Sequence, residues 1–556
     1  AVKSLSTYSK DALIKALTDI GNMGSGAADQ LKIGDRLMRL LGHPEPEVAA
    51  TAAWACGATC LHKATDFLLQ GLGHPTVSCR AACIEAIGKM GPPIDFGHSK
   101  AIADSATNDQ EPACKTAAAK ALGEMEATEC FEAVSGLLQD PVPEVKAAAM
   151  ETIGLFIGMS QEVESMFPPE TVSSLVTSMC ADDRTKQSAL LAVYNMGGKV
   201  PESCAGVVAS CLGDKDITIR LAAVAAVGAM PEAVMSSKEA LTNIKSCLKD
   251  SSSGVRAAAA QALAAVGKPA ADLAEEVLPL LADSEEDLSG LALQIGNGAK
   301  RPIPQMRRPK CAAVSALGRM GDSNYISKIS EALNDQIWEV RLCAAEALSM
   351  FGEAAKGEVS TIISLLEDDA FPVRATACNT LGVIGDAEAI SRLVEAFEDS
   401  SHSVRLAAVT AMGEFGEKAE EHSHEVFKLV NDQVGHVRGQ AARTLGQLGS
   451  TGANYASVIA TMLYDEDPEV RAAVCDALAC MGEAGAALAD EVSDRVQDPV
   501  AAVRDSAYAA LECFGYGVAP MLKDQPMTKH WKVEGIPGGQ AEGGRAEKFE
   551  GLGLFY

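Results

Sequence analysis

Histidines and cysteines gather near the N-terminus, and residues of these types could hold a metal ion. Within each of two pairs, Cys56 with Cys60 and Cys79 with Cys83, the cysteines are four residues apart, so each pair would share one face of a helix. The full group is His43, Cys56, Cys60, His62, His74, Cys79 and Cys83. Thiolate and imidazole ligands on neighbouring helices are typical of zinc sites. No Cys-x-x-Cys spacing occurs, however, and cysteines elsewhere fill ordinary small-residue positions. Core packing is therefore the favoured interpretation, and we predict neither a metal nor another cofactor.

Acidic residues and arginines recur in pairs, a combination that could serve acid–base chemistry. The pairs are Asp335 with Arg341, Asp368 with Arg374, Asp399 with Arg405, Asp432 with Arg438, Asp465 with Arg471 and Asp498 with Arg504. No histidine pattern supports a catalytic role for them, since the nine histidines are sparse and scattered. The sequence also contains no Gly-rich phosphate loop, zincin helix or nucleophile elbow. We therefore predict no catalytic residue and no enzyme activity.

A third group of candidate functional residues is cationic and lies within residues 284–310. Acidic residues come first, and a basic stretch rich in proline follows them. The basic residues are Lys300, Arg301, Arg307, Arg308 and Lys310. Because proline disrupts helices, we expect an extended loop here. On a chain of net charge −28 such a loop could contact an acidic partner, or it could pair with the protein's own acids. Both alternatives remain open.

The elements that would position these residues follow from a repeated phrase. A valine followed by arginine recurs with the valine at 340, 373, 404, 437, 470 and 503. In the copy at Val437, apolar residues at helical spacing predict one buried stripe, formed by Val437, Ala441, Leu445 and Leu448. Gly446 and Gly449 are expected to close this helix in a backbone conformation of positive φ. Asp432 is expected in the turn before it, facing Arg438, after a first helix over residues 422–432.

About fourteen such units lie between residues 30 and 516. The pattern of an acid, Val-Arg and then A-x-x-A-L-G-x-x-G resembles the HEAT repeat, and it is most similar to the HEAT-like repeats of phycobilin lyases. The resemblance implies an all-α fold, a right-handed α-solenoid of about 14 helical hairpins with an irregular C-terminal tail. It also implies that the Asp and Arg pairs form a structural ladder that ties one turn to the next repeat.

Departures from the repeat divide the chain. We expect an N-terminal helical cap (1–29), HEAT-like repeats (30–283), the inserted acidic and basic loop (284–310), further repeats (311–516) and a Gly-rich tail (517–556). The tail carries the hydrophobic anchors Trp531, Phe549, Leu554, Phe555 and Tyr556. These anchors could hold the tail on the chain's own groove or on a neighbouring subunit, and we favour the neighbour.

Composition narrows the possible partners. Hydrophobic residues make up 47% of the chain and aromatic residues only 4%, which is typical of closely packed helices. The charge of −28 disfavours nucleic acid and anionic membranes as partners. No apolar run is long enough to cross a bilayer. The 16 cysteines are scattered singly, which favours a reducing intracellular compartment, either the cytoplasm or an organelle matrix or stroma.

These observations favour a non-catalytic protein–protein interaction scaffold, an acidic subunit of a larger protein complex that binds other protein subunits and takes no small-molecule substrate. The alternative is a HEAT-like phycobilin lyase or a related pigment-protein maturation factor. Three second helices of the repeat are expected to line a concave face with small, mostly uncharged residues. The expected residues are Gly439, Gln440, Arg443, Thr444 and Gln447; Ala375, Thr376, Asn379, Thr380 and Val383; and Asp505, Ser506, Ala509 and Ala510.

Overall fold

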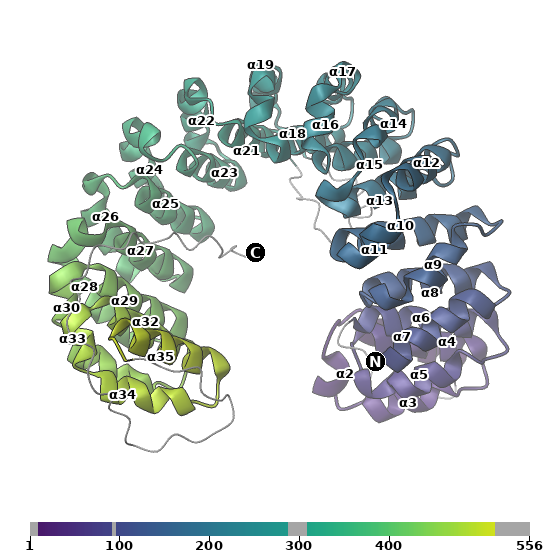
Figure 1. The fold of residues 1–556 in the computed structure, drawn as a ribbon, viewed down its shortest axis with the longest axis horizontal. Helices are drawn as coiled ribbons and strands as arrows, with labels where there is room; N and C mark the ends of the chain where they lie inside the picture. The colour runs from purple at the N-terminus through teal and green to yellow at the C-terminus, as the bar shows by residue number, and fades with distance from the viewer. Residues whose placement is uncertain (1–8, 92–95, 287–307, 517–556) are drawn as a thin grey trace. The chain divides into compact units, whose positions relative to one another are not determined.

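The computed structural model describes residues 9–91, 96–286 and 308–516. These residues form helices and connecting turns, without a β-strand among them. The chain divides into two compact units, Ala1–Thr361 and Ile362–Tyr556. None of the described helices is both long and apolar enough to span a lipid bilayer. The predicted all-α class is confirmed (Figure 1).

The first unit begins with α1 and ends within α24. Its α-helices are α1 (Lys10–Gly21), α2 (Ala27–Gln30), α3 (Gly34–Leu41), α4 (Pro46–Ala58), α5 (Thr65–Gly71), α6 (Val77–Met90), α7 (Phe96–Asn108), α8 (Pro112–Glu124), α9 (Phe131–Leu137), α10 (Pro143–Met159), α11 (Gln161–Met166), α12 (Pro169–Cys180), α13 (Lys186–Met196), α14 (Ala205–Cys211), α15 (Ile217–Gly228), α16 (Pro231–Ser236), α17 (Lys238–Cys247), α18 (Ser253–Val266), α19 (Ala274–Val277), α21 (Pro309–Met320), α22 (Ile326–Glu331), α23 (Trp338–Ser349) and α24 (Val359–Ser364).

The second unit contains α25 (Phe371–Ile384), α26 (Ile390–Glu395), α27 (His402–Phe415), α28 (Ser423–Lys428), α29 (Gly435–Gln447), α30 (Gly449–Ala453), α31 (Ala456–Ile459), α32 (Pro468–Cys480), α33 (Gly482–Ala486), α34 (Ala489–Ser493) and α35 (Ala501–Cys513). Short 3-10 helices join many of these elements in both units. They are η2 (His62–Ala64), η3 (Thr128–Cys130), η4 (Gly197–Lys199), η5 (Glu202–Cys204), η6 (Lys268–Leu273), η7 (Leu278–Ala282), η8 (Ser323–Tyr325), η9 (Ala332–Asn334), η10 (Gly352–Glu358), η11 (Leu365–Glu367), η12 (Ala387–Ala389), η13 (Ala396–Glu398), η14 (Gly416–His422), η15 (Leu429–Asn431), η16 (Ala460–Tyr464) and η17 (Asp494–Gln497).

Within each unit, the second helices of consecutive repeats pack directly on one another. In the second unit these are α25, α27, α29, α32 and α35, and each contacts the next. The first helices form the other layer, where α26, α28 and α34 pack against α27, α29 and α35 (Figure 1). A single hairpin cannot bury its apolar stripe, but such a stack can. Each unit is therefore an α-solenoid.

The predicted core of the unit at Val437 is confirmed. Val437, Ala441, Leu445 and Leu448 are all fully buried. The first helix differs in detail from the expected single helix over 422–432, because α28 tightens into the 3-10 helix η15 just before the turn. The tighter last turn leaves Asp432 in extended backbone, where its side chain is available to the turn.

The two glycines that were expected to close α29 have different roles. Gly449 has a φ of 65° and terminates the helix as predicted. Gly446 lies inside α29, so the expectation of positive φ is wrong for it. A Cβ at Gly446 would lie 2.8 Å from the carbonyl oxygen of Ala477. The missing side chain thus lets α29 approach α32 closely. In the first unit a Cβ at Gly318 would likewise lie 2.7 Å from the Ala347 side chain.

A short helix follows the second helix in some repeats, as α16, α30 and α33 do, and α11 is the copy that lengthens its repeat. The short helix α11 follows α10 and precedes the next first helix, α12. Lys199 holds this segment through the carbonyl oxygen of Ile157, at 2.8 Å, and the carboxylate of Glu164, at 3.0 Å. The insertion lengthens the interval between Lys146 and Lys186 beyond the usual 33 residues.

Candidate functional site

Arg438 in α29 shows how charged side chains connect neighbouring repeats. Its Nε and Nη2 donate to the two carboxylate oxygens of Asp465, in the next repeat, at 3.0 and 2.8 Å. Its Nη1 donates backward to the carbonyl oxygens of Asp432 and Gln433, at 3.0 and 3.3 Å. A planar guanidinium can serve both sets of acceptors at once. One arginine therefore binds the turn of its own repeat and the turn of the next.

Asp432 completes the same arrangement from the acidic side. Its Oδ1 accepts the backbone N–H of Val434 at 2.8 Å, which fixes the turn that starts α29. Its carboxylate is held by Arg405 of the preceding repeat at 2.7 and 2.9 Å. The side chain of Asp432 thus hydrogen-bonds to Arg405, whereas Arg438 donates to the backbone carbonyl oxygen of Asp432.

The same ion pair recurs between successive repeats of both units, with lysine replacing arginine in three places. The pairs are Arg80–Asp109, Lys115–Asp140, Lys186–Asp214, Arg220–Asp250, Arg256–Asp283, Lys310–Asp335, Arg374–Asp399, Arg405–Asp432, Arg438–Asp465 and Arg471–Asp498. Two predicted ladder arginines donate to the backbone of their own turns: Arg341 to Asp335, and Arg504 to Asp498 and Pro499. The ion pairs of the ladder are structural, since both oxygens of each aspartate carboxylate accept hydrogen bonds.

Arginine partners lower the pKa of ladder aspartates such as Asp498 and Asp109. Hydrogen bonds from Arg471 lower the pKa of Asp498, whose side chain is only 1% exposed, although burial opposes the shift. In the first unit the Arg80 guanidinium lowers the pKa of Asp109 to about 2. Groups held in the ionised form by fixed partners are poor proton donors or acceptors for a reaction.

The cationic loop is described only at its C-terminal end. Arg308 pairs with Glu286 at 2.6 Å, and Lys310 pairs with Asp335 as a member of the ladder. For these two residues, pairing with the chain's own acids is what the structure shows. The remaining candidates lie outside the described residues. They are Lys300, Arg301 and Arg307 of the loop and Trp531, Phe549, Leu554, Phe555 and Tyr556 of the tail.

The histidines and cysteines near the N-terminus serve turns and packing. His43 and His74 each accept a backbone N–H two residues on, at 3.1 and 3.0 Å, so these imidazoles fix turns. Burial raises the pKa of Cys56 and of Cys83 to about 12. Cys79 donates to the carbonyl oxygen of Pro46 at 3.2 Å. Across the part of the chain that the structure describes, no three His, Cys, Asp or Glu side chains are grouped to hold a metal ion.

Several residues that were expected on a concave face lie between the repeats instead. Thr444 is fully buried and donates to the carbonyl oxygen of Val409 in α27 at 2.8 Å. Thr380 and Ala510 are buried as well. The expectation was wrong for these residues because a neighbouring second helix packs against the positions where they lie. Sequence periodicity locates the apolar stripe but not the flanks that the next repeat covers.

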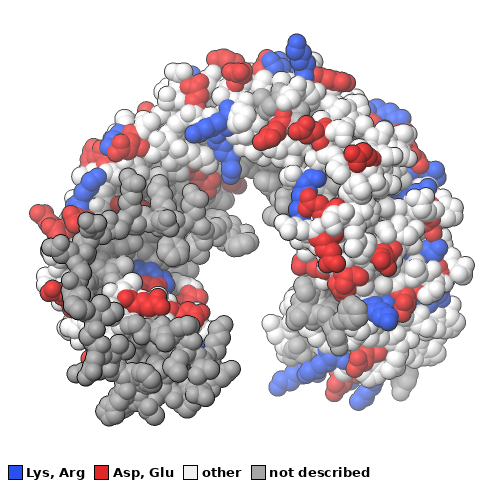
Figure 2. All heavy atoms as spheres, viewed as in Figure 1, with Lys and Arg blue, Asp and Glu red and all other residues white. Residues whose placement is uncertain are grey.

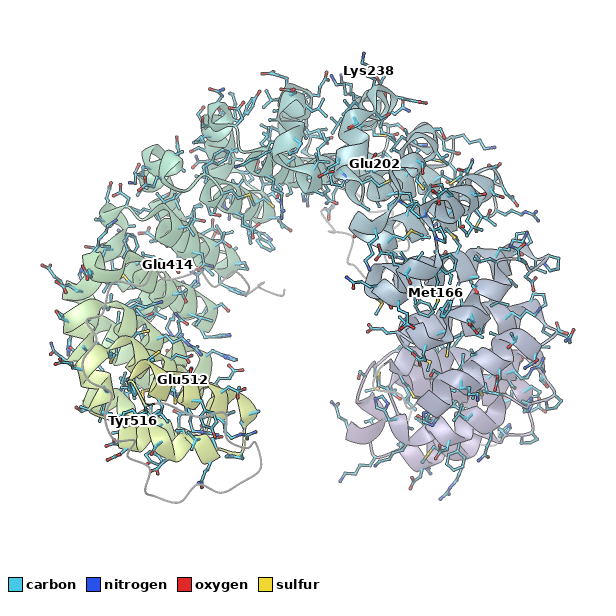
Figure 3. All side chains as sticks on the ribbon, viewed as in Figure 1. Met166, Glu202, Lys238, Glu414, Glu512 and Tyr516 are labelled. Atoms are coloured by element: carbon cyan, nitrogen blue, oxygen red, sulfur yellow. The ribbon has the colours of Figure 1, made fainter. Side chains whose placement is uncertain are left out.

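Asn379, Asp505 and Ala509 are exposed as expected, and one position in the last turn is exposed on every second helix of the second unit. We name the residues at this last-turn position the last-turn row; they are Val383, Glu414, Gln447, Cys480 and Cys513. All five are exposed, and they occupy equivalent positions on α25, α27, α29, α32 and α35. Figure 3 labels Glu414 of this row, and Glu512 beside Cys513. The row offers apolar, acidic, amide and thiol groups at the spacing of the repeat.

A hollow of about 340 Å³ lies between α1 and α4 and is lined by Thr18, Ala50, Thr51 and Trp54. Its two hydroxyl groups are committed to their own helices, because Thr18 donates to the Ile14 carbonyl and Thr51 to the Glu47 carbonyl. Ligand sites usually direct several polar groups at one point. This hollow lacks that feature.

The ladder and the stacked hairpins define an α-solenoid in each unit. Each repeat contacts its nearest neighbours through helix packing and ion pairs. The family model for HEAT repeats matches residues 1–93, 205–290, 359–433 and 424–512, and the model for the PBS lyase HEAT-like repeat matches residues 309–335. These segments cover more than half of the chain. The protein belongs to the HEAT-repeat family, as its repeat pattern predicted.

Solved structures of similar fold include importin beta and the karyopherin Kap121p. A crystal structure of importin beta is 13% identical, with a TM-score of 0.51 over 87% of this chain and 72% of that one. The karyopherin Kap121p bound to the extreme C-terminus of the phosphatase Cdc14p is 12% identical, with a TM-score of 0.56 over 91% and 69%. Kap121p bound to Ste12p is 12% identical, with a TM-score of 0.54 over 92% and 70%. At this identity the likeness concerns the fold alone. No curated protein sequence matches the chain.

Proposed function

We propose that the protein is a non-catalytic scaffold that serves as a structural or assembly subunit of a larger multiprotein complex. The observation that carries this proposal is that the ladder side chains join the repeats, whereas the last-turn row stays exposed. The ladder pairs are engaged in joining one repeat to the next, as in Arg438 with Asp465. The last-turn row is left exposed at regular spacing. Such a surface suits an extended protein partner.

The remaining surface fits a protein partner better than a polyanion. Figure 2 shows Lys, Arg, Asp and Glu in separated groups with uncharged surface between them. The chain as a whole carries a charge of −28, which opposes nucleic acid and anionic lipid. The two Kap121p complexes, one bound to the extreme C-terminus of Cdc14p and one bound to Ste12p, are examples of this fold binding other proteins.

The alternative, a phycobilin lyase, has narrower support. It rests on the match of residues 309–335 to a PBS lyase HEAT-like repeat, one repeat among many. A lyase would retain colour when purified after incubation with a bilin, whereas a scaffold would purify with partner subunits and stay colourless. Pigment transfer to an acceptor protein by the purified chain would overturn the scaffold proposal.

Two exposed valines of the second unit allow a matched test of the last-turn row. Val383 is 55% exposed and belongs to the row, whereas Val458 is 48% exposed and lies on the first-layer helix α31. Full-length protein carrying Val383→Asp is expected to lose co-purifying subunits in affinity purification with mass spectrometry, with unchanged thermal melting. Val458→Asp should keep them. If both variants retain every partner equally, the last-turn row is not part of the interaction surface.

A further inference from the structure

Arg504, in α35, has the position of a ladder arginine, but no aspartate of the described residues pairs with it. Its Nη1 donates to the carbonyl oxygens of Asp498 and Pro499 at 2.8 and 3.1 Å. Arg471 makes the same backbone contacts one repeat earlier, and its Nε and Nη2 also bind both carboxylate oxygens of Asp498 at 2.8 and 2.9 Å. In Arg504 the Nε and Nη2 groups contact no carboxylate within the part of the chain that the structure describes. A planar guanidinium that is fixed along one edge is ready to bind a carboxylate along the other.

The outward face of α35 differs from that of the earlier second helices. Asp505 and Glu512, the latter labelled in Figure 3, are exposed at positions where α29 has buried glycines that contact α32. Another second helix packed this closely would bury both carboxylates, which is costly. Phe514 is only half-buried, although Leu448 and Met481, at its position in the two preceding repeats, are buried. The end of the stack is thus unsuited to another second helix, yet it leaves an apolar side chain partly uncovered.

Apolar residues recur at fixed distances before most ladder aspartates, at six, three and two positions earlier. The segment 277–283, which reads VLPLLAD, shows the structure that this spacing forms. Val277 is fully buried, the residues after it form η7, and Asp283 pairs with Arg256 at 2.7 Å. Pro279 is tolerated because it lies in the first turn of η7, where no helical hydrogen bond needs its N–H. The spacing therefore indicates the end of a first helix and a turn whose aspartate binds the preceding ladder arginine.

The segment 518–524, which follows α35 and reads VAPMLKD, keeps the same spacing. Four of its seven residues are identical to those of 277–283, among them the proline and the aspartate, Asp524. The segment lies outside the described residues, and its sequence and its position after Arg504 indicate the same role. No second helix of the repeat pattern follows, because Lys529 and His530 replace the Val-Arg phrase. The sequence thus supplies a first helix and a turn without a second helix, as the face of α35 requires.

The chain between α35 and Asp524 is long enough for this contact. Asp524 comes nine residues after Gly515, which has a φ of 85° and terminates α35 as Gly449 terminates α29. An extended chain of this length spans up to about 30 Å, whereas the 13 residues of α35 rise by about 20 Å. Asp465 comes 16 residues after Gly449, so the segment after α35 has room only for the last turns of a first helix.

We propose that residues 518–524 form a half-repeat on the end of the second unit, in which Asp524 binds the free edge of the Arg504 guanidinium. The apolar residues of the segment cover the end of the stack, and the aromatic tail then starts from a fixed point on the repeats. A second copy of the chain, stacked head to tail, would not replace Asp524. Its first two turns carry His43 and His74 where later turns carry aspartate.

A chemical cross-link tests this contact in the full-length protein. Because the ladder also uses lysine, as in Lys186 with its aspartate partner, Arg504→Lys should keep the pair. A carbodiimide joins a lysine amine to a carboxylate in contact with it, and mass spectrometry of tryptic peptides identifies the link. We expect Arg504→Lys protein to form a link to Asp524 and none to Glu534, a tail carboxylate without the apolar spacing. A link to neither, or to both equally, would overturn the proposal. So would a link between copies, detected by mixing ¹⁵N-labelled and unlabelled protein.

Hydrogen–deuterium exchange gives a second measurement on the purified protein. Removal of residues 518–556 should speed amide exchange in α35 by at least about tenfold, whereas removal of 525–556 keeps Asp524 and should leave it unchanged. The effects of Arg504→Ala and Asp524→Ala should not add when combined, because both remove the same pair. Glu534→Ala is the matched control and should exchange like the unsubstituted protein.

A partner protein is the rival source of the carboxylate. In that case Asp524→Ala would leave both the exchange of α35 and the co-purifying subunits unchanged, whereas Arg504→Ala would release subunits in affinity purification. This combination of results would show that the pairing within the chain is wrong.

Discussion

Arg438 hydrogen-bonds to the turns of two successive repeats, so its loss should lower the stability of the fold. Replacing it with alanine would leave Asp465, 14% exposed, without its guanidinium partner. We expect Arg438→Ala to lower the free energy of unfolding by about 1–3 kcal/mol, measured by chemical denaturation. Arg443→Ala is the control, because Arg443 and Asp476 are each 41% exposed and such pairs contribute about 0–1 kcal/mol. Loss of one binding partner at unchanged stability would instead make Arg438 a contact residue.

The ladder aspartates also predict the acid sensitivity of the fold. The pKa of Asp109 is about 2 in the folded chain, below the value of about 3.9 in an unfolded one. A lowered folded pKa means that the stabilisation is present above about pH 4 and is lost as the pH falls toward 2, by about 2 kcal/mol for this group. We expect Asp109→Asn to lower the melting temperature at pH 7 and to have little effect near pH 2. Asp66→Asn, at a side chain 86% exposed, is the control and should leave the melting temperature at pH 7 almost unchanged.

Glu126 occupies a position where most repeats have a closing glycine. Its φ is 58°, a conformation that costs a residue with a side chain roughly 1–2 kcal/mol. We expect Glu126→Gly to raise the free energy of unfolding by about 0.5–1 kcal/mol, since glycine accepts this φ at the cost of some chain entropy. Glu85→Gly, in the middle of α6, should do the opposite by about 1 kcal/mol. Destabilisation by both substitutions would show that the side chain of Glu126 outweighs its backbone strain.

At the scale of the element, helix spacing depends on small residues that helix propensity alone would replace. Gly318 faces Ala347 so closely that a Cβ would fall 2.7 Å from its side chain. We expect Gly318→Ala to destabilise the protein by about 1–3 kcal/mol despite alanine's better propensity, because α21 and α23 would have to separate. Gly206, in α14, has open space at its Cβ, so Gly206→Ala should stabilise by about 0.5–1 kcal/mol. Thermal and denaturant unfolding of the full chain would measure both.

Prediction from sequence succeeds for elements and is weaker for the contacts between them. The stripe from Val437 to Leu448 and the turn at Asp432 follow from spacing within one repeat, which the sequence contains. The burial of Thr444 and the close approach at Gly446 depend on the helix of the next repeat, whose orientation no local pattern states. Helix α11 could have been found, since the interval from Lys146 to Lys186 exceeds the regular one.

At the scale of the whole molecule, the C-terminal tail remains a sequence-based proposal for partner binding. Deleting residues 525–556 should leave helix content and melting almost unchanged, because no repeat of the pattern extends into them. The truncated protein is expected to leave its assembly, as judged by gel filtration of cell extracts. Full-length protein with Trp531→Ala and Phe555→Ala is the companion variant, since it removes anchors and keeps length. If both variants assemble normally, the tail does not bind the partner, and the repeats must do so.

In the ladder, each arginine pairs with an aspartate that comes later in the chain. Arg374 pairs with Asp399, 25 residues later, and Arg405 pairs with Asp432, 27 residues later. During translation, each arginine leaves the ribosome before its partner aspartate. Its ion pair can form once the first helix and turn of the next repeat have been synthesised. Chain growth can therefore add one hairpin at a time onto a finished end, with a single unpaired cation marking where the next hairpin docks.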